Sequence, residues 1–190
     1  MALKLITAPT NLAVDLADAK LQCRVSGSDE DALLTRLIRG AVARGEHQTG
    51  RAFVDQEWEV ILDAFPVHEI ELAKPPQISV TSVTYLDTTG VQQTLSPSAY
   101  ALDADVLPGW LFPAAGTSWP ATLDAANAVR IRFRCGYGAD AAAVPEGIRD
   151  WLLVQVSTLY DNRDAVALAK ADDSATSFAS HMLDPFRTYA

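Results

Sequence analysis

The chain has 190 residues, of which 49% are hydrophobic and 21% charged, and its formal net charge is −9. This composition is typical of a globular protein and excludes a disordered or collagen-like chain. Acidic residues outnumber basic ones by 24 to 15, which argues against broad binding to the phosphate backbone of nucleic acids. No apolar run approaches the roughly 20 residues of a membrane span, and the N-terminus lacks a signal-peptide pattern, so we expect a cytoplasmic protein.

The first part of the chain predicts helices. Asp15 can cap a short helix over residues 16–23, and Ser28 can cap a longer one that ends at Gly50. In the longer helix the apolar side chains recur at helical spacing and share one face, namely Leu34, Leu37, Ile38, Ala41 and Gly45. This face is expected to lie in a core.

After Gly50 the spacing of apolar residues changes from helical to every second residue. Between Val54 and Asp63 apolar residues alternate with acidic ones, which predicts a half-buried antiparallel strand. The acidic residues Asp55, Glu57 and Glu59 fall on its solvent face. Further short strands are expected at residues 68–72, 78–86, 91–95, 100–103 and 110–112. Residues 129–135 alternate cleanly, with Arg130, Arg132 and Arg134 pointing outward.

A second long helix is predicted over residues 144–163. Pro145 suits a first helical position, and the apolar residues of this segment cover more than one stripe. One partner helix cannot cover so wide an apolar surface. We therefore expect other subunits to cover part of it.

Helices before and after a run of antiparallel strands predict the α+β class. We expect a helical core from residues 14–50 and 144–164, with an inserted β-module of about seven short strands at 53–138. Together they form one domain over residues 1–164. Residues 165–190 are expected to be a tail that follows this domain.

The sequence contains no recognisable catalytic, cofactor or metal motif. Neither the histidines nor the cysteines have the spacing of metal ligands, and all five are read as ordinary residues: His47, His68, His181, Cys23 and Cys135. This absence favours a structural role. The alternative is a soluble enzyme or small-ligand protein with a site assembled from scattered residues, such as Tyr85, Tyr137, Asp103 and His68.

Several short motifs occur in a characteristic order along nearly the whole chain. They are residues 31–38, Thr49-Gly-Arg51, residues 58–62 before Phe65-Pro66, Pro75-Pro76, Gly136-Tyr-Gly138 and residues 160–163. In this order the chain resembles the tailed-phage head–tail connector (adaptor) family in its longer form. It is also similar to the adaptor proteins of gene-transfer particles.

The resemblance implies a structural protein of the virion neck, assembled in the bacterial host cytoplasm, with no enzymatic activity and no cofactor. The implied partners are the portal protein, a tail-side neck or tail-terminator protein, and other copies of the chain in a dodecameric ring. DNA would pass through the lumen without specific binding, and no membrane is involved. A tail-terminator-type assembly protein remains an alternative.

The tail at 165–190 is expected to dock onto the portal or a neighbouring subunit and to be mobile when alone. Its apolar, aromatic and basic residues would be the anchors: Phe178, Met182, Leu183, Pro185, Phe186, Arg187 and Tyr189.

A channel through which DNA passes should not bind the DNA phosphates strongly. The lumen is therefore expected to be acidic or neutral, lined either by the acidic face at residues 55–59 or by the loop with Asp103 and Asp105. The three arginines at 130–134 would lie away from the lumen or pair with carboxylates.

Overall fold

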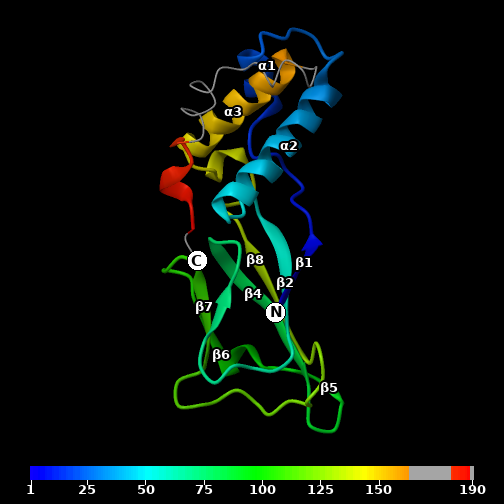
Figure 1. Cartoon of the computed structure of the whole chain (residues 1–190), viewed down its shortest axis with the longest axis vertical. Helices are drawn as coiled ribbons and strands as arrows, with labels where there is room; N and C mark the ends of the chain where they lie inside the picture. The colour runs from blue at the N-terminus through cyan, green and yellow to red at the C-terminus, as the bar shows by residue number, and fades with distance from the viewer. Residues whose placement is uncertain (163–180, 189–190) are drawn as a thin grey trace. The chain divides into compact units, whose positions relative to one another are not determined.

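A computed structural model describes residues 1–162 and 181–188. The chain forms two compact units, one from residues 1–9 and 55–136 and the other from residues 10–54 and 137–190 (Figure 1). The first unit contains the strands and the second contains the α-helices. The predicted α+β class is therefore confirmed, and the β unit also includes the N-terminus, which was not predicted.

The β unit contains two antiparallel sheets. The larger sheet has the order β1 (Ala2–Thr7), β2 (Gln56–Leu62), β8 (Val129–Cys135), β4 (Gln77–Leu86), β5 (Gln92–Thr94). The smaller sheet has the order β3 (Ile70–Leu72), β7 (Gly109–Pro113), β6 (Tyr100–Asp103). The described residues thus contain eight strands where about seven were predicted, the addition being β1.

Register in the larger sheet separates an apolar from a charged face. Val60 lies opposite Ile131, which lies opposite Val83, and all three side chains are fully buried. The charged residues of β2 and β8 lie on the other face of the sheet, because successive side chains of a strand point to opposite faces. Strand β8 has the predicted boundaries and the predicted alternation of buried and exposed residues.

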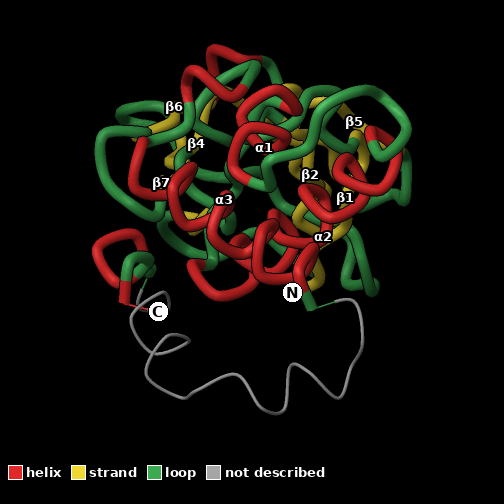
Figure 2. Tube along the Cα trace, turned by 90° about the horizontal axis from the view of Figure 1, so that it is seen from above, coloured by secondary structure: helices red, strands yellow, loops and turns green. Residues whose placement is uncertain are grey.

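The helical unit is built on α1 (Leu16–Gln22), α2 (Asp31–Thr49) and α3 (Glu146–Asp161). Helices α2 and α3 pack side by side (Figures 1 and 2). Their contact buries Leu34, Ile38, Ile148, Leu152 and Val156 completely. Removing side chains of this size from water stabilises the fold by about 1.5–3 kcal/mol each.

The close approach of α2 to α3 requires a glycine at position 45. A Cβ atom on Gly45 would lie 2.7 Å from Phe53 Cε2 and 2.9 Å from Trp151 Cζ3. Two aromatic rings therefore occupy the space that any other side chain would need.

Helix boundaries differ in part from the prediction. Helix α2 begins at Asp31 and not after Ser28, because residues 28–30 form a turn in which Asp31 N donates to Ser28 O. Gly50 ends the helix in the left-handed conformation, with φ of 73°, as predicted. Helix α3 begins one residue after Pro145 and ends at Asp161, two residues before the predicted end. None of the described helices has both the length and the hydropathy of a membrane span.

Candidate interaction surfaces

Three of the four residues considered for a scattered enzyme site make packing or turn-forming contacts in the structure. Among the described residues no group of three or more His, Cys, Asp or Glu side chains could hold a metal ion. Of the scattered set, the backbone carbonyl of His68 accepts a hydrogen bond from Trp119 Nε1 at 2.6 Å. Tyr85 contacts the ring of Phe65, Asp103 accepts a hydrogen bond from Asp105 N, and Tyr137 bonds to Arg51. The structure gives these groups packing and turn-forming contacts.

A row of ion pairs joins the arginines of β8 to carboxylates on and just before β2. On β8, Arg130 and Arg132 donate to the two carboxylate oxygens of Glu59 on β2, at 3.0 and 2.8 Å. Arg134 donates through Nε to Asp55 at 3.1 Å. All three arginines are thus paired with carboxylates, which is one of the two predicted arrangements.

Glu59 was predicted on a solvent-exposed face, and its burial corrects this expectation. The face is the predicted one, but the residue is only 2% exposed because two arginine side chains cover it. Burial alone would raise the pKa of this carboxyl. Hydrogen bonds from Arg132 and Arg130, together with their positive charges, outweigh burial and lower the pKa below its ordinary value.

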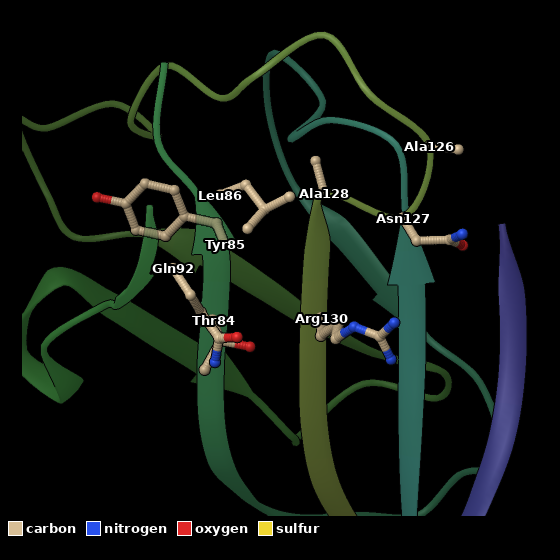
Figure 3. A pocket seen from close by; sticks show the side chains of 8 residues that line it. All are labelled: Thr84, Tyr85, Leu86, Gln92, Ala126, Asn127, Ala128 and Arg130. Atoms are coloured by element: carbon tan, nitrogen blue, oxygen red, sulfur yellow. The ribbon is translucent and has the colours of Figure 1, made fainter. Parts of the chain in front are cut away.

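Figure 3 shows a pocket beside these ion pairs, at the ends of β4 and β8. It has a volume of about 340 Å³ and is lined by residues 84–86, 92, 126–128 and 130. Arg130 is its one charged lining residue and extends toward β2, where it pairs with Glu59. The pocket therefore offers no free charged group to a ligand.

The described part of the tail packs against the helical unit of its own chain. Leu183 is completely buried in the helical core, and Met182 and Phe186 pack against that core. The Phe186 ring lies over α3, where a Cβ atom on Gly147 would be 3.3 Å from Phe186 Cε2. Residues 184–186 form a short 3₁₀ turn in which Asp184 pairs with His181 at 2.9 Å and with Arg187 at 3.2 Å. The hydrogen bond from His181 is the main cause that lowers the pKa of Asp184.

Arg51 holds this segment in place. Its Nε donates to the carbonyl oxygen of Phe186, and its Nη1 donates to the Tyr137 hydroxyl at 3.1 Å. A backbone bond adds to this contact, because Thr188 N, two residues after Phe186, donates to Thr49 O, two residues before Arg51, at 2.9 Å. One guanidinium group therefore joins the loop after α2, the segment before α3 and the end of the chain.

The seven predicted anchor residues have different surroundings. Leu183 is buried, Pro185 is exposed, and Met182, Phe186 and Arg187 are half-buried. Phe178 and Tyr189 lie outside the described residues, as does most of the predicted tail. In the structure residues 181–188 bury Leu183 against the helices, and the expectation that the tail is mobile when alone stays a prediction. Binding of these residues to a partner stays a prediction.

Sequence reasoning assigned no role to Arg51 and considered Tyr137 only for the alternative enzyme site. Both residues belong to motifs, Thr49-Gly-Arg51 and Gly136-Tyr-Gly138, that carry the family resemblance. The signal was therefore present in the sequence, but nothing in it indicated that these distant motifs make contact.

Comparison with known families finds a match in the first half of the chain. Residues 13–84 match the family described as phage gp6-like head-tail connector protein. The match confirms the resemblance for the segment from before α1 to within β4. No curated protein sequence matches the chain.

Solved structures of gene transfer agent (GTA) particles resemble the whole chain. A chain from the neck of an empty GTA particle, computed with C6 symmetry, is 22% identical with a TM-score of 0.83. A chain from the virion of a native particle is 23% identical with a TM-score of 0.81. A chain from the neck of a native particle, computed with C12 symmetry, is 21% identical with a TM-score of 0.74. Each alignment covers 100% of this chain and 97% of the other, so these likenesses establish the fold.

Proposed function

We propose that this chain is a structural head–tail connector, a subunit of an oligomeric ring in the neck of a phage-like particle. The observation that carries the proposal is the full-length likeness to a neck chain, with a TM-score of 0.83. The connector-family match over residues 13–84 supports it independently. A soluble enzyme is the weaker alternative, because three of its four candidate residues, Tyr85, Asp103 and Tyr137, make packing or turn-forming contacts.

The proposed partners are the portal protein on one side and a tail-side neck or tail-terminator protein on the other. The ring itself would contain twelve copies, a number compatible with the C6 and C12 symmetries used for the GTA necks. Assembly would take place in the bacterial host cytoplasm. The tail residues predicted as anchors would contact the portal or a neighbouring subunit.

Passage of DNA through the ring fits the charges of the β unit. This unit contains ten acidic and five basic residues, and its three β8 arginines are paired with carboxylates. Paired arginines release few counterions from DNA, so they would bind phosphates weakly. The acidic face at residues 55–59 is largely neutralised by these arginines, so a lumen lined by this face would be neutral and not acidic.

The proposal is tested by locating the chain in purified particles. The gene is deleted and replaced by a copy with an epitope tag, and particles are examined by electron microscopy with a tag-specific antibody. Labelling at the head–tail junction, together with tailless heads in the deletion strain, is the expected result. Labelling elsewhere, or intact particles without the chain, would refute the proposed function.

A further inference from the structure

The larger sheet ends in two open edges. On one side β1 pairs only with β2, so its outer edge has no partner. On the other side β5 pairs with residues 84–86 of β4, and Leu95 N extends this pairing to Val83 O. The outer edge of β4 from Ile78 to Ser82 is therefore left without a backbone partner among the described residues.

We propose that β1 of one copy pairs with the open Ile78–Ser82 edge of β4 in the next copy, with Lys4 opposite Thr81. This inference rests on the proposed ring and names the contact that joins its subunits. The pairing would add a strand to an existing sheet edge, which is a common mode of recognition between chains. It also removes two exposed edges that would otherwise favour aggregation.

Strand direction agrees with this pairing. Every neighbouring pair in the sheet is antiparallel, so β1 and β8 run one way and β2 and β4 run the other. A copy related by rotation about an axis roughly along the strands keeps these directions. Its β1 would meet β4 in the antiparallel sense, as the rest of the sheet requires.

The side-chain rows agree as well. Leu5, Trp58, Phe133 and Val80 form one row across β1, β2, β8 and β4. If Lys4 faces Thr81, the neighbour's Leu5 faces Val80 and continues this apolar row into the next subunit. Leu5 and Ile78 are each 41% exposed in the single chain. The pairing would cover apolar side chains at both edges, as expected of an interface.

Charge favours the same register. Lys4 is the one charged residue of β1, and it forms no ion pair within the described part of the chain. On the acceptor side, Thr81 donates to the Glu57 carboxylate at 2.8 Å, which brings a negative charge to the β4 edge. Glu57 forms no ion pair with any described residue. A lysine placed opposite Thr81 would reach this carboxylate, whereas a neutral or basic edge would not attract it.

Such a contact joins two different edges of the same sheet. It is therefore heterologous, and repetition produces either a closed ring or an open filament. Mounting on a portal would select the ring. The contact differs from a symmetric dimer in a way that cross-linking can measure.

The test places one cysteine on each edge, as Lys4→Cys and Thr81→Cys in one chain. Directly opposed residues of antiparallel strands have Cβ atoms close enough for a disulfide. Particles carrying this double variant should give disulfide-linked multimers beyond the dimer after mild oxidation. A mixture of the two single variants should give dimers only, and each single variant alone should give monomer. The control pair Lys4→Cys with Val91→Cys, whose second site is 56% exposed in a hairpin turn, should give no multimers.

Monomer alone from particles that contain the double variant at the neck would overturn the pairing while leaving the connector function intact. Dimers from Lys4→Cys alone would overturn it in favour of a symmetric contact. Failure to find the wild-type chain at the neck would instead refute the proposed function.

A charge exchange tests the pairing without cysteines. Lys4→Glu alone places like charges across the contact, and so does Glu57→Lys alone, so neither variant should support particle assembly. When the two variants are produced together, each contact joins opposite charges, and assembly should return. Assembly by either variant alone, or no rescue by the pair when both variants fold, would overturn the proposed register.

Discussion

Truncation of Leu183 tests whether the end of the chain is part of the helical core. The side chain is completely buried among core residues of the helical unit. Leu→Ala substitutions at such positions cost about 2–5 kcal/mol. For Leu183→Ala we expect a loss near the lower end of this range, at about 2–3 kcal/mol. The segment that carries Leu183 can detach from the helices, so the loss cannot exceed the free energy with which this segment docks.

Urea unfolding followed by circular dichroism at 222 nm measures this loss, since the helical unit dominates that signal. By the scaling for chains of 150–250 residues, the same loss lowers the melting temperature by about 4–12 °C. The matched control is Leu21→Ala, which truncates a leucine on α1 that is 80% exposed. It should change stability by less than about 0.5 kcal/mol. Equal stabilities for the two variants would show that the segment does not dock on the helices of its own chain.

Three further substitutions test other parts of the structure. Gly45→Ala should lower the free energy of unfolding by about 1–3 kcal/mol, because the new methyl group meets two aromatic rings. Gly40→Ala in the same helix has open space and should raise the free energy of unfolding by about 0.5–1 kcal/mol. Equal urea midpoints for the two variants would contradict this. Glu59→Gln should lower the free energy of unfolding by about 1–3 kcal/mol at pH 7. The loss should lie near the lower end of this range, because both arginines are half-exposed and water can hydrate them. Since folding lowers the Glu59 pKa from its ordinary 4.5, the wild type loses this stabilisation as pH falls from about 5 through the lowered pKa. Over that range the free energy of unfolding of Glu59→Gln should depend less on pH than that of the wild type. The same pH dependence in both proteins would argue against the ion pairs. Arg51→Lys keeps the charge but loses the two-pronged donor, so amide exchange at residues 183–188 should become faster; unchanged exchange would contradict the role given to Arg51.

The sequence predicted correctly those elements that are determined by the residues within them and directly beside them. Strand β8 has the predicted limits because apolar residues and arginines alternate without interruption from Val129 to Cys135. The end of α2 at Gly50 follows from the backbone freedom of glycine. The packing of α2 on α3 also follows from two apolar faces that need cover.

Long-range contacts explain what the sequence did not reveal. Strand β1 is stabilised by pairing with β2, which lies some fifty residues away, and its own alternation is weak. The burial of Glu59 depends on two arginines from β8 that neutralise its charge. The burial of Leu183 depends on core residues from separate segments of the helical unit, and the sequence around Leu183 does not indicate which residues those are.

The most direct test of the connector assignment is a cryo-electron microscopy map of purified particles at a resolution that traces side chains. The account predicts this chain in a symmetric ring between portal and tail, with the apolar row of Leu5, Trp58, Phe133 and Val80 continuing from each subunit into the next. A neck built without this chain, or one copy per portal vertex, would contradict it.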